Sequence, residues 1–170
     1  MAENQCRVRP AVPADAPGIA RVHVDSWRET YTGLVPERYF SERAFERRKA
    51  WWLQNLSAES PAGPVWVAER DDRIVGFASA GPAIGPDAEK GYAPARALQL
   101  FTIYLLASEH GTGAGRALLE GVIGDQPAQL WVATANARAR AFYERNGFHV
   151  DGGEYVDPDI DGLVEIRMVR

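Results

Sequence analysis

The feature that most constrains this chain is a series of alternate glycines between an apolar segment and the start of a helix. Residues 97–106 are almost continuously apolar, which predicts a central strand covered on both faces. Glycines follow at 111, 113 and 115, and the segment from Ala114 to about Ile123 carries the apolar stripe of a helix. A strand, a glycine loop and a helix in this order expose backbone N–H groups at a helix N-terminus, which predicts a phosphate site.

Composition limits what this loop can belong to. A chain of 170 residues with 46% hydrophobic residues can bury one substantial core, so we expect a single domain over residues 1–170. The net charge of −4 disfavours a nucleic-acid partner. Neither a signal core nor a membrane-length apolar segment is present, so we expect no membrane partner and a cytoplasmic location. With Cys6 as the only cysteine and three scattered histidines, we expect no metal site.

The first third of the chain predicts one edge strand followed by two amphipathic helices. The strand covers residues 7–12, and Gly33 and Pro36 separate the helices. Trp27 and Tyr31 come just before this break, where aromatic side chains can form a substrate pocket, although they can equally pack the helices against a sheet. Glu29 lies between them and is a candidate to bind or deprotonate an amine.

The rest of the chain predicts strands on both sides of the glycine loop. Two apolar runs around Asp71-Asp72-Arg73 indicate an antiparallel hairpin. A buried strand is expected at residues 129–133, and Asn136 can cap a helix whose inward residues are Ala137, Ala141 and Phe142 and which ends at Gly147. Residues 148–150 and 163–169 are expected to complete the sheet.

The spacing around the glycines separates several phosphate-binding classes. A P-loop ends in Gly-Lys-Ser/Thr, whereas this loop ends in Gly115-Arg116-Ala117, which disfavours ATP or GTP hydrolysis. A dinucleotide fingerprint needs a glycine at its sixth position, and counting from Gly111 that position is Arg116. A Rossmann dehydrogenase is therefore disfavoured as well.

Two motifs together resemble the GCN5-related N-acetyltransferase (GNAT) family. The family's acyl-CoA loop, Gln/Arg-x-x-Gly-x-Gly/Ala, matches residues 110–115 except that His110 stands at the first position, and its Asn-x-x-Ala-x-x-Phe-Tyr-x-x-x-Gly-Phe motif matches Asn136 to Phe148. The resemblance covers nearly the whole chain. It implies a single α/β (α+β) domain, with about four helices around a mixed, mostly antiparallel sheet of about seven strands and a splayed central parallel pair. It also makes a homodimer possible.

The resemblance implies acetyl-CoA as co-substrate and a direct transfer of its acetyl group to an amine. The loop N–H groups and Arg116 would hold the pyrophosphate, and the pantetheine would pair with the strand at residues 103–105, with a main-chain N–H near Leu105 polarising the thioester carbonyl. The complete set implied for acetyl-CoA is Ile103, Tyr104, Leu105, His110, Gly111, Thr112, Gly113, Ala114, Gly115, Arg116 and Asn136.

Tyr143 is the catalytic residue that the resemblance implies, as the acid that protonates the departing thiolate. Without the motif it would be interpreted as a core aromatic residue. Many relatives carry a glutamate as base where this chain has Gln99, so the base is left unassigned among Glu29, Asp25 and a bound water. The expected acceptor is a small primary amine, with a peptide or protein N-terminus and a non-catalytic acyl-CoA sensor as the alternatives.

Overall fold

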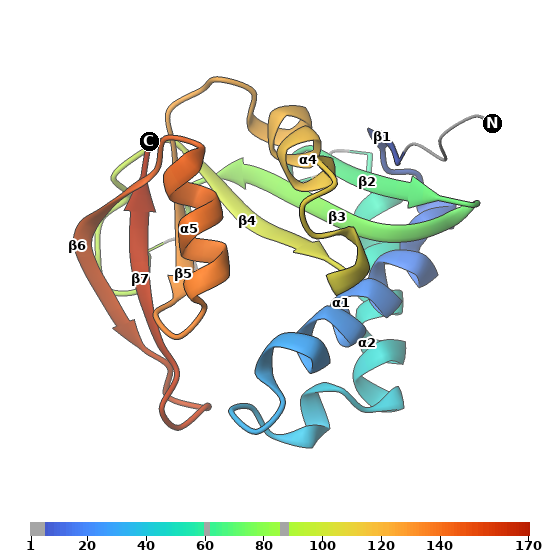
Figure 1. The fold of residues 1–170 in the computed structure, drawn as a ribbon, viewed down its shortest axis with the longest axis horizontal. Helices are drawn as coiled ribbons and strands as arrows, with labels where there is room; N and C mark the ends of the chain where they lie inside the picture. The colour runs from blue at the N-terminus through green and yellow to red at the C-terminus, as the bar shows by residue number, and fades with distance from the viewer. Residues whose placement is uncertain (1–5, 60–61, 86–88) are drawn as a thin grey trace.

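The computed structural model describes residues 6–59, 62–85 and 89–170, which form one sheet with helices on both faces (Figure 1). The seven strands lie in the order β1-β2-β3-β4-β5-β7-β6, and β4–β5 is the parallel pair. The strands are β1 (Arg7–Pro10), β2 (Val65–Arg70), β3 (Arg73–Pro82), β4 (Leu98–Leu105), β5 (Ala128–Ala133), β6 (His149–Val156) and β7 (Val164–Val169). The described α-helices are α1 (Ala16–Tyr31), α2 (Glu42–Leu56), α4 (Ala114–Ile123) and α5 (Ala137–Arg145).

Two apolar clusters cover the two faces of the sheet. α4 and α5 lie on one face, where the predicted stripe of α4 is buried and the helix packs against β1, β2, β3 and β4. α1 and α2 cover the other face, with Ile19, Val22 and Trp52 packed on Val67 and Phe77. The β2–β3 hairpin turns at Asp71 and Asp72, whose φ values of 50° and 58° suit a two-residue turn, and this confirms the predicted hairpin.

β4 and β5 meet at one end and then separate. Their register contains only Leu98↔Ala128 and Gln99↔Gln129. The buried Gln129 side chain closes this end: its Nε2 donates to Gln99 Oε1 (2.9 Å) and its Oε1 accepts from the amide of Ala95 (2.6 Å). Beyond this point a bulge between β3 and β4 shifts their register, which bends a strand away from its neighbours. The expected splayed parallel pair is confirmed.

Three details of the sequence prediction were wrong. β4 is not covered on both faces, since Phe101 is exposed and residues 102–105 are half-buried where the strands separate. In α5, Ala137 is exposed and Tyr143 is the buried residue, because the helix is short and only one of its faces meets the sheet. β6 runs to Val156 and is therefore longer than expected. Within the described ranges, no helix is both long and apolar enough to cross a membrane.

Candidate active site

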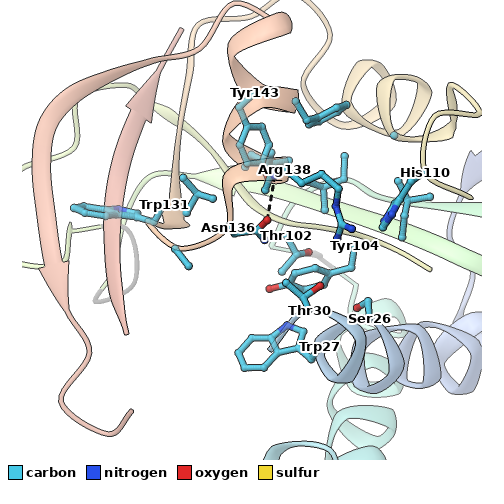
Figure 2. Close-up of a pocket in the computed structure, with 18 of the residues that line it drawn as sticks. Ser26, Trp27, Thr30, Thr102, Tyr104, His110, Trp131, Asn136, Arg138 and Tyr143 are labelled. Atoms are coloured by element: carbon cyan, nitrogen blue, oxygen red, sulfur yellow. Dashed lines mark hydrogen bonds between the residues drawn. The ribbon is translucent and has the colours of Figure 1, made fainter. Parts of the chain in front are cut away.

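A cavity of about 910 Å³ lies where β4 and β5 separate (Figure 2). In this view Tyr143 and Arg138 of α5 lie on one side and Trp27 and Thr30 of α1 on the other, with Tyr104 between them. The structure brings most of the predicted site residues into its lining: Trp27, Tyr31, Ile103, Tyr104, Leu105, His110, Gly111, Gly113, Gly115, Arg116, Asn136 and Tyr143. Thr112, Ala114 and Glu29 are not in the lining of this cavity.

The glycine loop forms a cradle of hydrogen-bond donors at one end of the cavity. Gly111 and Gly113 have φ values of 82° and 90°, which favour glycine. A Cβ at either position would lie in open space, so the lack of a side chain leaves the backbone accessible to a ligand. Within the described structure, the N–H groups of Gly111, Gly113, Gly115 and Arg116 donate to no protein acceptor. Four free donors at the start of a ten-residue helix suit a phosphate group.

Two loop residues shape this cradle without lining it. The Thr112 hydroxyl donates to the Glu109 carbonyl (2.9 Å), and the Ala114 amide donates to that hydroxyl (3.4 Å). Gly115 serves a different purpose, because a Cβ there would lie 3.1 Å from Leu105 Cδ1 and 3.3 Å from the Phe142 ring. Glycine at this position therefore lets the start of α4 approach the sheet closely.

An ion pair that sequence reasoning missed supports the loop from behind. Arg70, on β2, donates from Nε and Nη2 to the two carboxylate oxygens of Glu109, both at 2.9 Å. Glu109 is only 5% exposed, so both of its oxygens need such a partner. The two residues are 39 positions apart, and no local pattern signals their contact.

The charge at this end of the cavity comes from arginines. Burial, and then the charge of Arg138, lower the pKa of His110, which is therefore neutral at neutral pH. Arg116, Arg138 and Arg145 line the cavity. Of these only Arg116 was predicted; the other two lie on α5, and no sequence motif singled them out.

The free edge of β4 runs from the loop towards the middle of the cavity. The Leu106 amide donates to the Val75 carbonyl (3.0 Å), and backbone groups alternate between the two edges of a strand. The N–H and C=O groups of Ile103 and Leu105 therefore face the gap left by β5. Tyr104 turns its backbone towards β3, opposite Phe77, and contributes its side chain to the cavity.

Tyr143 and Asn136 bring α5 to the same cavity. Tyr143 is 7% exposed, its hydroxyl has no hydrogen-bond partner among the described residues, and burial raises its pKa well above the usual value near 10. It therefore remains protonated at physiological pH. Asn136 is the expected helix cap, since its Oδ1 accepts from the Ala139 amide (3.1 Å), while its Nδ2 donates to the Tyr31 hydroxyl (3.4 Å). Its contact with the cofactor stays a prediction.

Aromatic rings surround the other half of the cavity. Trp27 lies 5.3 Å from Tyr31 and 6.3 Å from Tyr104 between ring centroids. Burial raises the pKa of both tyrosines. Trp131, on β5, completes this aromatic half, which therefore offers an apolar surface with hydroxyl groups at its margin.

None of the residues considered for removing a proton from the amine lies in the main cavity. The Glu29 carboxylate accepts from the Ala107 amide (2.9 Å) and lines a smaller neighbouring hollow. Asp25 pairs with Arg28 (3.0 Å) on the surface of α1. Gln99 is buried at the junction of β4 and β5. Among the described residues there is also no cluster of three or more potential metal ligands.

Comparison with known proteins identifies the family. Residues 61–150 match the acetyltransferase (GNAT) domain family. The chain belongs to the GNAT acetyltransferases. It is 28% identical to the probable N-acetyltransferase Rv2775 of Mycobacterium tuberculosis over 96% of this chain and 91% of that protein, and 36% identical to the uncharacterized N-acetyltransferase YuaI of Bacillus subtilis over 66% of this chain and 59% of that protein.

Solved GNAT structures share the fold over its full length. The PaiA N-acetyltransferase of Thermoplasma acidophilum, solved with coenzyme A, has a TM-score of 0.70 at 22% identity and covers 98% of both chains. A ribosomal-protein-alanine N-acetyltransferase of Brucella melitensis also has a TM-score of 0.70, at 25% identity, over 96% of this chain and 98% of its own. As a GNAT acyltransferase this protein uses acetyl-CoA as co-substrate, and the donor cradle at Gly111 and Gly113 fits its phosphates.

Proposed function

We propose that this GNAT acetyltransferase acetylates the primary amine of a small molecule by direct attack on the thioester. One observation carries the proposal: a single cavity joins the free donors of the glycine loop, the unpaired edge of β4, the Tyr143 hydroxyl and an aromatic half. The glycine loop and the β4 edge fit acetyl-CoA, the Tyr143 hydroxyl lies between the two halves of the cavity, and the aromatic half remains for the amine acceptor.

The chain holds the donor mainly through its backbone. The N–H groups of Gly111, Gly113, Gly115 and Arg116 bind the pyrophosphate, and the nearby arginine side chains add positive charge. The exposed backbone groups of Ile103 and the carbonyl of Leu105 pair with the pantetheine amides in the manner of an additional strand. In this arrangement the Leu105 N–H is a fixed dipole for the thioester oxygen, whose negative charge grows as the amine attacks.

Bound acetyl-CoA supplies the activated acetyl group, and the protein supplies position and one proton. The aromatic half holds the neutral amine against the carbonyl carbon, so that a C–N bond forms as the C–S bond breaks. Tyr143 donates its hydroxyl proton to the departing sulfur. The proton lost by the amine passes to water in the cavity mouth, and Tyr143 regains a proton from this water, since none of the carboxylates first considered for this role lies in the main cavity.

Thiol release from acetyl-CoA tests the proposal. Purified protein would be assayed against alkylamines, arylalkylamines, amino acids and short peptides with free N-termini, with mass spectrometry of the products. We expect N-acetylation of at least one small amine, with kcat/KM above that of every peptide. Preferential acetylation of peptides would instead favour an N-terminal acetyltransferase, the activity named for the Brucella melitensis neighbour.

A further inference from the structure

The aromatic half of the cavity contains one carboxylate that the donor site does not use. Of the described residues that line the cavity, only Glu109 and Glu165 are acidic. Both oxygens of Glu109 are bonded to Arg70 behind the glycine loop. Glu165, on β7, is the remaining acidic group, and neither the sequence motifs nor the donor site accounts for it.

The sheet register places Glu165 on the acceptor side. Glu165 lies opposite Ala133 of β5, and two residues along each strand Arg167 of β7 lies opposite Trp131. Register partners in antiparallel strands point to the same face of the sheet. The alternating residues Leu130 and Met168 face the core under α4 and α5, so Glu165 shares the other face with Trp131. Its charge also raises the pKa of Tyr31 and Tyr104, which approach from α1 and β4.

Glu165 can still accept another cation. Its Oε2 forms an ion pair with Lys90 Nζ, and this ammonium group also lies 4.4 Å from the centroid of the Tyr155 ring. The other oxygen, Oε1, has no hydrogen-bond partner in the described part of the chain, and the side chain is 20% exposed. A carboxylate can accept up to about four hydrogen bonds, so one ion pair leaves sites for a ligand.

The surrounding side chains indicate which cation would bind. Trp27, Tyr31, Tyr104 and Trp131 provide ring faces and edges for an apolar body, and aromatic faces also attract ammonium groups. We propose that Glu165 binds the ammonium group of the acceptor, and that the acceptor is an alkylamine or arylalkylamine whose apolar body packs on these rings. This inference rests on the proposed function. It further predicts that a carboxylate next to the amine, as in an α-amino acid, is repelled by Glu165.

Glu165→Gln tests this assignment while nearly preserving the shape of the side chain. With 2-phenylethylamine, an ammonium ion at neutral pH, we expect KM to rise roughly 10- to 100-fold, the range for losing a hydrogen bond to a charged group. With aniline, which is uncharged at neutral pH, KM should stay within about twofold, as should KM for acetyl-CoA. Equal KM values for 2-phenylethylamine in wild type and Glu165→Gln would overturn the inference.

Two control variants separate ammonium binding from a purely structural role. Lys90→Met removes the competing cation, so KM for 2-phenylethylamine should fall or stay unchanged. If Lys90→Met instead raises KM for both 2-phenylethylamine and aniline, to the same extent as Glu165→Gln, the ion pair has only a structural role and the inference fails. Glu154→Gln removes an exposed charge from the neighbouring strand β6 and should change neither KM.

Equilibrium binding distinguishes this inference from the proposed function. Calorimetry would measure 2-phenylethylamine binding to CoA-saturated wild type and Glu165→Gln, and we expect roughly 10-fold or greater weakening in the variant. If no amine is acetylated but this difference persists, the proposed function fails and the binding site stands. If the amine binds both proteins equally, or neither, the inference fails whatever the activity.

Discussion

His23 should make the stability of this protein depend on pH in a measurable way. It lies on α1 with its ring 5.7 Å from Trp27, 5.8 Å from Phe77 and 5.0 Å from Tyr104, and its buried Nδ1 has no hydrogen-bond partner among the described residues. Burial, reinforced by the charge of Arg48, lowers its pKa to about 3. The folded protein therefore resists protonation of this ring.

The sign and size of the effect follow from linkage. In the unfolded chain the pKa of a histidine is about 6.5, so as pH falls below this value the unfolded state takes up a proton that the folded state does not. The contribution of His23 is fully present above pH 6.5 and is lost as pH falls towards 3. Between pH 7 and pH 5 the loss is about 2 kcal/mol, because His23 takes up a proton over this range in the unfolded chain but stays neutral in the folded protein, where its pKa is about 3.

Urea unfolding at pH 7 and pH 5, followed by tryptophan fluorescence, would measure this loss in wild type, His23→Leu and His149→Gln. His149 is the matched control because it is exposed on β6. We expect wild type and His149→Gln to lose about 2 kcal/mol more than His23→Leu between the two pH values. Apart from these two histidines, the titrating groups are common to all three proteins and cancel. An equal loss in His23→Leu would refute the argument.

Two further predictions concern the donor half of the site. Tyr143→Phe should lower kcat by roughly 10²- to 10⁴-fold, the usual range for a general acid. Acetyl-CoA binding and stability should stay near wild type, because removal of the hydroxyl leaves no described protein group without a hydrogen-bond partner. An unchanged kcat would show that Tyr143 is not the acid. Gly113→Val should abolish the stabilisation that CoA gives in a thermal-shift assay, whereas Gly152→Val, at a φ of 95° with equally open surroundings on β6, shares the backbone strain but should keep the CoA-dependent shift. A normal CoA shift in Gly113→Val would show that this loop does not hold the phosphates.

The donor half could be predicted from sequence because its determinants are local. The glycine turn before α4, the apolar stripe of α4 and the cap at Asn136 each depend on residues within one or two helical turns, and the structure contains all three. The binding of acetyl-CoA at these residues stays a prediction. Backbone donors need only glycines and a helix start, which a sequence shows directly. Even His110, the departure from the family motif, leaves these donors unchanged.

The acceptor half could not be predicted because strand pairing assembles it. Glu165 faces the cavity only because β7 inserts between β5 and β6, an order that no local pattern specifies. Glu29, by contrast, had the right neighbours in sequence, but a helix sends successive side chains in different directions. Its carboxylate meets the Ala107 amide next to the glycine loop, while Trp27 and Tyr31 face the cavity.

The position of Gln99 changes what the missing glutamate means. Its side chain is 3% exposed and accepts a hydrogen bond from Gln129, at the end of β4 where the two strands are still joined. A carboxylate at position 99 would be buried beside the Gln129 side-chain amide, whose oxygen accepts from the backbone N–H groups of Ala95 and Arg96. It would therefore lie away from the gap in which the amine must react. In this chain the position holds the parallel strands together, and their separation beyond it creates the cavity. The absence of a glutamate is therefore no sign of lost catalysis, and proton removal must be sought from water or from groups on the aromatic side.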